Sequence, residues 1–432
     1  MNPEQPASSL PADKRPAGRP SGGATAFLLL VTALAFLPWL VSTTVAGFST
    51  TGWAWMIALV AGTAIILKRH TREIVFPLRH WTAWLVLLGS YWVFAGRHPS
   101  SLQTLVQITT PLVVGCAASA SSYTRAQIDR ICAWLPRLVL VVFAVLLIRH
   151  PSICLGRLPA HGMLTPEAIT CSLLAAIYAA FFGVGGNLRL LLCYATMLLF
   201  CVVMMTRGPL MACAAALPLS LSRMKLSWRV FLGGLLVILG LSIFNSPRYQ
   251  RLLFVSGQGT LDEVRWDNAN LLTSGRKPLW ELLWSSWQEA PWTGKGLNAS
   301  RTVLLENGYS IYLPHNDWLK LLHDFGIIGM TCFALSILFQ IHGLLRLART
   351  TRGNIQMLAY AAASGFVPFV VVMFTDNVTL YVQYYSNVHF ALIGLVYGTL
   401  REHPCVAKPR IGGYLGSDAR HKAAGSGQLR AP

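Results

Sequence analysis

Long apolar runs separated by short polar stretches make up most of this chain of 432 residues. Most runs are about 18 to 20 residues long, which is the length that an α-helix needs to cross the hydrocarbon core of a bilayer. We predict twelve spans, at residues 24–46, 50–67, 80–96, 102–120, 131–149, 163–183, 188–206, 208–222, 229–245, 326–345, 356–375 and 380–399. The pattern therefore predicts an all-α, polytopic membrane protein.

One long polar stretch interrupts the apolar pattern, and we predict that it forms a large helical loop outside the membrane. It divides the chain into a basic tail at 1–23, spans one to nine at 24–245, the loop at 246–325, spans ten to twelve at 326–400, and a second basic tail at 401–432. Both tails lack an apolar period and are rich in small residues, so we expect them to be disordered.

Within the loop, the pattern is helical from Arg276 to Gln288, with three tryptophans at i, i+4 and i+7 on one face: Trp280, Trp284 and Trp287. The pair Ala290-Pro291 ends this helix, because proline cannot continue it. We expect a second helix to begin near His315.

Charge supports an orientation for these spans. Charged residues are 12% of the chain, about half the usual fraction in soluble domains, and the net charge is +19. The short stretches 68–79, 223–229 and 344–354 are basic, and basic loops remain in the cytoplasm. With twelve spans, both tails are then cytoplasmic, and the loop and the turn at Arg207 lie outside.

Several classes of chemistry have no support in the sequence. The chain lacks His-Glu-x-x-His, Cys-x-x-Cys, a P-loop and a dinucleotide-binding glycine motif. Its nine cysteines lie mostly in apolar runs without ligand spacing, so we interpret them as core residues. We therefore expect no metal and no cofactor. Membrane lipids are expected partners and nucleic acid is not.

Two arginines are candidates for binding an anion such as phosphate. Arg207 lies in the turn between two apolar spans, where it either marks the membrane boundary or binds an anion. Arg276 follows Ser274-Gly275 and opens a helix, whose free N–H groups favour phosphate; a solvated helix end is the alternative.

His315 is the candidate general base, because a neutral imidazole can accept a proton from a sugar hydroxyl. A structural histidine is the alternative, since no partner carboxylate can be assigned from the sequence. The tryptophans suit either the membrane interface or stacking on sugar rings. The predicted substrate-binding residues are Arg97, Arg149, Arg157, Trp280, Trp284, Arg301 and Asn316, although most of the additional arginines also suit ordinary headgroup contacts.

Four short motifs occur in order between residues 273 and 329. They are Thr273-Ser274-Gly275-Arg276, Pro291-Trp292-Thr293-Gly294-Lys295-Gly296, His315-Asn316-Asp317-Trp318-Leu319 and Gly326-Ile327-Ile328-Gly329. This series of Ser-Gly-Arg, Pro-x-x-Gly-x-Gly, His-Asn-x-x-Leu and Gly-x-x-Gly, in the outer loop of a twelve-span protein, resembles the O-antigen ligase and polymerase superfamily.

The resemblance implies a GT-C-like glycosyltransferase of the bacterial inner membrane with a periplasmic active site. The donor would be undecaprenyl-diphosphate-linked O-antigen and the acceptor a sugar hydroxyl of lipid A–core. Transfer would invert the anomeric centre without metal or nucleotide. Arg207 and Arg276 would stabilise the diphosphate that leaves, and His315 would deprotonate the acceptor.

Three alternatives remain open. Polymerases of the superfamily usually have two sizeable outer loops and protein-modifying members often have an extra domain, so the single loop here favours a ligase. A transporter of lipid-linked sugars would also explain twelve spans and basic outer residues. It predicts ionisable groups near the bilayer midplane, where this chain has almost none apart from His389.

Overall fold

The computed structural model describes residues 22–401, except residues 42, 70–72, 95–97, 99, 152–164, 205, 266, 274, 311 and 312. The first half contains α1 (Gly22–Leu40), β1 (Thr44–Val45), β2 (Phe48–Ser49), α2 (Thr50–Leu67), η2 (Leu78–His80), α3 (Thr82–Phe94), α4 (Ser101–Ser119), α5 (Arg125–Trp134), η3 (Leu135–Arg137), α6 (Leu138–Arg149), α7 (Thr165–Gly185), α8 (Leu188–Met204) and α9 (Arg207–Ala216). The second half contains α10 (Leu226–Phe244), α11 (Pro247–Leu253), η5 (Leu261–Glu263), α12 (Arg276–Trp287), α13 (Ala299–Glu306), α14 (Asp317–Thr350), α15 (Gly353–Ser364), α16 (Phe366–Val372), α17 (Ser386–Gly398) and η6 (Thr399–Arg401).

The chain is an all-α, polytopic membrane protein, as the apolar pattern predicts. Each of the twelve predicted spans overlaps a helix, although the first, 24–46, extends past α1 into β1. In the part of the chain that the structure describes, seven helical stretches have the length and composition to cross a membrane: Thr50–Leu67, Ser101–Ser119, Arg125–Arg149, Thr165–Gly185, Leu226–Phe244, Asp317–Thr350 and Gly353–Val372. Three shorter apolar helices add to them, and twelve crossings stay a prediction.

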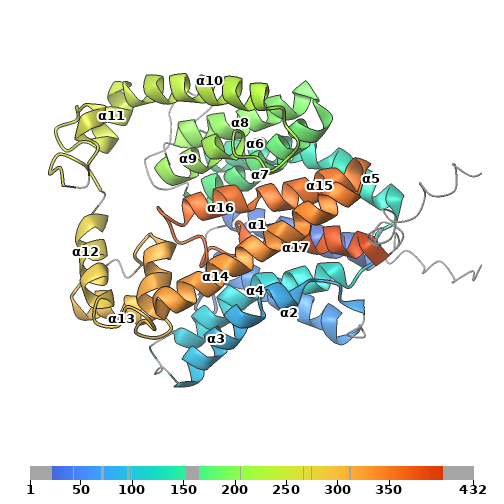
Figure 1. Cartoon of the computed structure of the whole chain (residues 1–432), viewed down its shortest axis with the longest axis horizontal. Helices are drawn as coiled ribbons and strands as arrows, with labels where there is room; N and C mark the ends of the chain where they lie inside the picture. The colour runs from blue at the N-terminus through green and yellow to red at the C-terminus, as the bar shows by residue number, and fades with distance from the viewer. Residues whose placement is uncertain are drawn as a thin grey trace, which may run out of the picture.

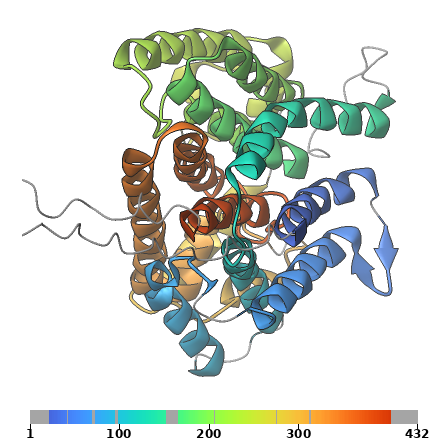
Figure 2. The same ribbon diagram turned by 90° about the vertical axis from the view of Figure 1, so that its right-hand side faces the viewer.

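The helices pack around α7, whose apolar window is 83% buried inside the protein. Its alanines, among them Ala175, Ala176, Ala179 and Ala180, are fully buried against the neighbouring helices α8, α9 and α15. Small residues let helix backbones approach closely in a membrane protein, where apolar side chains gain little from leaving lipid. In contrast, only 6% of the apolar window of α10 is buried inside the protein, and this helix lies at the rim of the bundle in Figure 1 and again in Figure 2.

The predicted loop forms a helical cap at one end of the bundle. Figure 1 shows α11, α12 and α13 together at this end, with α5 at the other end. Leu279 and Leu283 of α12 form a small core with Leu304 of α13 and Leu319 of α14. The predicted helix at 276–288 is confirmed as α12, whereas α11 and α13 have no counterpart in the sequence analysis.

The expectation that the second loop helix begins near His315 is confirmed to within two residues. Helix α14 begins at Asp317, and the Asn316 side chain caps it by accepting the N–H of Leu319 at 3.0 Å. His315 precedes the cap in a left-handed conformation, with φ of 50°. This conformation is unfavourable for a residue with a Cβ, although histidine tolerates it better than most.

Helix α14 bends at Gly326, where the φ angle is 65°. A Cβ on Gly326 would lie 2.2 Å from the carbonyl oxygen of Trp292, and one on Gly294 would lie 2.5 Å from the Gly326 nitrogen. The N–H groups of Ile327 and Ile328 donate to the carbonyls of Pro291 and Trp292 at 2.9 and 3.1 Å. The Pro-x-x-Gly-x-Gly and Gly-x-x-Gly motifs are therefore a single close backbone contact.

Candidate active site

Arg207 and Arg276, which are 69 positions apart in the sequence, line one cavity of about 270 Å³. Arg207 is the first residue of α9 in the membrane bundle, and Arg276 is the first residue of α12 in the cap. Asp376, from the segment between α16 and α17, also lines this cavity, which we call the arginine cavity. It lies where the cap meets the bundle.

A tight turn at the start of α12 places the Arg276 side chain against the bundle. Gly275 has a φ of 74°, a left-handed conformation that glycine adopts without a steric penalty, and it lets α12 begin at Arg276. The Nη1 group of Arg276 donates to the carbonyl of Thr375 at 2.5 Å. Burial lowers the pKa of Arg276 from its ordinary value, but a guanidinium stays charged at any physiological pH.

Arg207 forms hydrogen bonds to the backbone of two segments of the cap. Its Nη1 donates to the carbonyl of Leu272 at 2.9 Å, and its Nη2 donates to the carbonyl of Leu252. Burial is the main cause that lowers the pKa of Arg207, and the nearby Arg276 lowers it further. The Cα of Gly208 lies so close to Thr375 that an added Cβ would be 2.0 Å from the Thr375 hydroxyl. The start of α9 is thus packed directly against the segment that Arg276 contacts.

Two guanidinium groups and one carboxylate give the arginine cavity an excess of positive charge. Like charges that are partly buried repel each other, which costs free energy unless an anion joins them. Planar guanidinium groups bind phosphate oxygens through paired, charge-assisted hydrogen bonds. The cavity is therefore suited to a phosphate or diphosphate group.

Asp376 also contacts His315, so a carboxylate that lines the arginine cavity with both arginines is also a partner of the histidine. Nδ1 of His315 is 3.2 Å from Oδ1 of Asp376. The backbone N–H of His315 donates to Oδ1 of Asn377 at 3.1 Å, and Nδ2 of Asn377 is 3.1 Å from His315 Nδ1. A protonated Nδ1 would donate to Asp376, whereas an unprotonated Nδ1 would accept from Asn377 Nδ2. Because the charge-assisted bond to Asp376 is the stronger one, we propose the tautomer with a proton on Nδ1. Nε2 is then the basic atom.

The segment 313–317 and the segment 373–379 lie against each other and form a wall that carries His315. The N–H of Asp317 donates to the carbonyl of Met373 at 2.7 Å, and Oδ2 of Asp317 accepts the N–H of Thr379 at 2.7 Å. Trp280 Nε1 donates to the carbonyl of Pro314 at 2.5 Å. These bonds hold the strained backbone at His315 in place.

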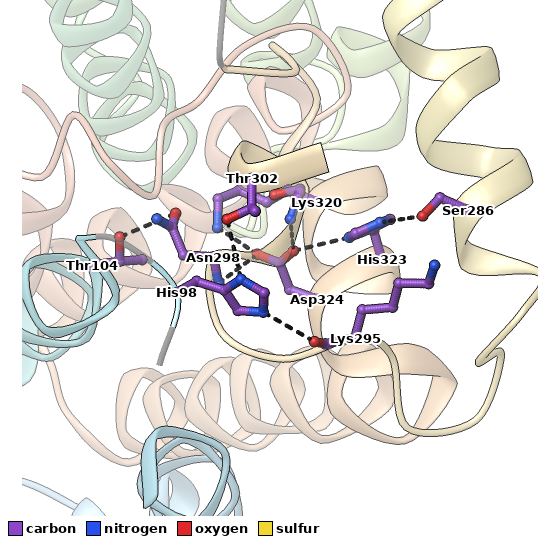
Figure 3. Close-up of polar contacts among 10 residues, drawn as sticks. His98, Thr104, Ser286, Lys295, Asn298, Thr302, Lys320, His323 and Asp324 are labelled. Carbon is purple, nitrogen blue, oxygen red and sulfur yellow. Dashed lines mark hydrogen bonds and ion pairs between the residues drawn. The ribbon is translucent and has the colours of Figure 1, made fainter. Parts of the chain in front are cut away.

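A second polar network is centred on Asp324, which is buried together with Lys320 and His323 (Figure 3). The Asp324 carboxylate accepts Lys320 Nζ at 2.9 Å and lies 3.1 Å from His323 Nδ1. It also accepts the backbone N–H groups of Asn298 and Ser300 at 3.2 and 2.7 Å, at the start of α13. An acidic group at a helix start is stabilised by the free N–H groups there.

The same network connects the helices that carry the candidate catalytic residues. His323 Nε2 is 3.1 Å from the Ser286 hydroxyl of α12, and His98 contacts Thr302 of α13 at 3.1 Å (Figure 3). Helix α12 begins with Arg276 and α14 follows His315. The Asp324 network therefore fixes the distance between these two helices.

The other predicted substrate-binding residues lie in different places. Trp280, Trp284 and Asn316 line a second cavity of about 580 Å³. Arg149 is at the end of α6, where Nη1 donates to Glu167 at 2.7 Å and to the carbonyl of Trp39 at 2.8 Å.

Three arginines complete this set. Arg301 is on α13 and lines neither the arginine cavity nor the second cavity. Arg97 and Arg157 lie outside the described residues.

The sequence analysis missed Asp376 and Asn377, the partners of His315. Both are in Thr375-Asp376-Asn377, a polar triplet between two predicted spans. The sequence signal that could have indicated these partners is a carboxylate at the membrane boundary. Lys320, His323 and Asp324 were also missed, although their spacing of three and four residues places them near one another on a helix.

No group of three or more His, Cys, Asp or Glu side chains suited to a metal ion occurs among the residues that the structure describes. Asp376 and His315 form only a pair. The expectation that the reaction needs no metal stays a prediction.

Comparison with known proteins identifies one family. A family model described as "O-Antigen ligase" matches residues 192–334. The matched region begins in α8 and ends within α14, so it includes Arg207, Arg276 and His315 together with the whole cap. A search of curated proteins found no match to the chain.

Proposed function

Because the chain contains a domain of the O-antigen ligase family at residues 192–334, we propose that it joins O-antigen to lipid A–core. The donor is undecaprenyl-diphosphate-linked O-antigen, and the acceptor is a sugar hydroxyl of lipid A–core. The reaction takes place on the outer face of the bacterial inner membrane, with both tails in the cytoplasm.

One observation supports this proposal most: residues from the bundle and from the cap converge at the arginine cavity. Arg207 and Arg276 line it with Asp376, whose carboxylate is 3.2 Å from His315 Nδ1. A phosphate-binding group and a candidate base thus occur side by side. A lipid-linked diphosphate is already an activated leaving group, so the chemistry needs no nucleotide.

In the proposed reaction, Nε2 of His315 accepts the proton of the acceptor hydroxyl as its oxygen attacks the anomeric carbon of the donor. The bond between that carbon and the diphosphate oxygen breaks, and its electron pair stays on the diphosphate. Arg207 and Arg276 stabilise this charge, which grows during the reaction. Attack from the side opposite the leaving group inverts the anomeric centre. The Asp376 carboxylate stabilises the imidazolium that forms.

The single cap in the part of the chain that the structure describes favours a ligase over an O-antigen polymerase. An oligosaccharyltransferase acting on protein is a further alternative of the same superfamily. A transporter of lipid-linked sugars is the alternative from another class. The positioned His315–Asp376 pair favours an enzyme, because transport requires no base.

Reconstitution of the purified protein separates these classes. Proteoliposomes would contain undecaprenyl-diphosphate-linked O-antigen and lipid A–core, and products would be resolved by mass. We expect a covalent O-antigen–core conjugate. Elongated donor without conjugate would indicate a polymerase. Movement of the donor across the bilayer without any new product would indicate a transporter and contradict the proposal.

A further inference from the structure

The second cavity, of about 580 Å³, meets the arginine cavity at the wall that carries His315. Trp280 lines both cavities. Asn316 and Phe374 line the second cavity, and they are the sequence neighbours of His315 and Thr375. A ligand in the second cavity would therefore reach the wall close to His315 without entering the arginine cavity.

The lining of this cavity is mostly apolar, with a polar edge. Its rings come from α12, α14 and the segment after α16, its aliphatic side chains come from α14, and its polar groups are one carboxylate and one amide: Trp280, Trp284, Trp318, Phe374, Leu319, Leu322, Met330, Glu281 and Asn316. The Asn316 amide oxygen is occupied by the helix cap, which leaves its Nδ2 group to donate to a ligand. The Glu281 side chain is 56% exposed and can accept hydrogen bonds.

The tryptophans and the polar edge of this cavity fit a pyranose ring better than a lipid chain. A sugar ring has an apolar face of C–H groups, which packs on an aromatic ring, and an edge of hydroxyl groups, which bond to amides and carboxylates. A polyprenyl or acyl chain gains nothing from a carboxylate and an amide at the cavity edge, because it cannot bond to either. The volume is in the range of ordinary ligand sites.

We propose that the second cavity is the acceptor subsite, where a core sugar of lipid A–core stacks on Trp284 and Trp280. This inference rests on the proposed function. The diphosphate of the donor occupies the arginine cavity at the same time. The acceptor hydroxyl then approaches His315 from the second cavity.

Trp284 is the residue on which to test this proposal. Its side chain is 49% exposed, and its ring lies 4.7 Å from that of Trp287. The core of the cap is formed by other positions of α12, Leu279 and Leu283, which face away from the solvent. Replacing Trp284 therefore removes a stacking surface without removing a core side chain.

The experiment measures initial rates of conjugate formation by the full-length protein while donor and acceptor are varied separately. We expect Trp284→Ala to raise the KM for lipid A–core by roughly tenfold, equivalent to about 1.4 kcal/mol. The KM for the donor should stay unchanged, which also verifies that the variant is folded. Trp284→Phe should retain most of the affinity. Trp292→Ala is the matched control, because this side chain is 65% exposed and lines neither cavity.

A delipidated core oligosaccharide provides a second arm. It should inhibit the wild-type protein in competition with lipid A–core and should inhibit Trp284→Ala much more weakly. An increase in the donor KM instead would assign the cavity to the polyprenyl chain and overturn the proposal. Unchanged constants for both substrates would also overturn it. If the wild-type protein forms no conjugate at all, the proposed function fails instead.

Discussion

At the scale of single residues, the proposed role of His315 as a base rests on the contacts that its side chain and backbone make. His315 is held by Asp376 and Asn377 in an unfavourable left-handed conformation, with φ of 50°. Such strain persists only where neighbouring contacts impose it, and it is concentrated at functional sites. Replacing residues around His315 should consequently affect catalysis more than stability.

Asp376→Asn should lower the turnover number by roughly 10²-fold, because a neutral amide stabilises the imidazolium much less than a carboxylate does. The donor KM should not rise, since removal of a negative charge leaves the arginine cavity more positive. Steady-state kinetics on purified protein tests both statements. Asp262→Asn, at an exposed position of the cap, is the control. A raised donor KM with unchanged turnover would contradict the assigned role.

Arg207→Gln and Arg276→Gln should each slow transfer by roughly 10²-fold or more, as expected when a charged group is removed from a developing anion. Since both groups act on one diphosphate, the double variant should lose less than the product of the single effects. Rates from the same assay test this, with Arg265→Gln as a control on the exposed part of the cap. Strictly multiplicative losses would indicate two independent sites.

At the scale of elements, the cap is positioned by contacts that no local pattern predicts. The helical period of 276–288 is strong enough to predict α12. The start of α14 was predicted to within two residues, and the cap at Asn316 decides its exact position at Asp317. The kink at Gly326 follows from contact with Gly294, which is distant in sequence and therefore invisible to a periodicity argument.

The buried ion pair of Lys320 and Asp324 gives a test at this scale. Asp324→Asn should destabilise the protein by about 3–5 kcal/mol, because Lys320 remains buried without its counter-charge. The double variant Asp324→Asn with Lys320→Met should recover much of that loss, since both charges are gone. Thermal unfolding in detergent measures the effect. If the double variant is at least as unstable as Asp324→Asn alone, the unpaired charge of Lys320 does not cause the destabilisation.

At the scale of the whole molecule, the apolar pattern was sufficient for the fold class because seven of the described helical stretches have the length and composition to cross a membrane. Each of the twelve predicted segments overlaps a helix. Convergence at the arginine cavity could not be predicted in the same way, because α9, α12 and the segment after α16 meet only through tertiary packing. Asp376 lies in a boundary triplet, Thr375-Asp376-Asn377, which a single sequence does not distinguish from an ordinary membrane edge.

The orientation is tested by accessibility. An epitope inserted after Arg265 should be labelled in intact spheroplasts, because the cap is predicted to lie outside the cytoplasm. One inserted after Arg352, in a basic loop, should be labelled only after permeabilisation. Immunofluorescence or flow cytometry measures both, with activity of each insertion variant as the control for folding. The reverse pattern would invert the topology and place the arginine cavity in the cytoplasm.

The central claim is that His315 deprotonates the acceptor beside the arginine cavity, and single-turnover transfer tests it most directly. Purified protein preloaded with O-antigen donor would be mixed with excess lipid A–core in buffer containing EDTA. We predict conjugate formation by the wild-type protein at full rate, and a loss of roughly 10²- to 10⁴-fold for His315→Ala, with donor binding retained. Unchanged transfer by His315→Ala, or a wild-type rate abolished by EDTA, would contradict the account.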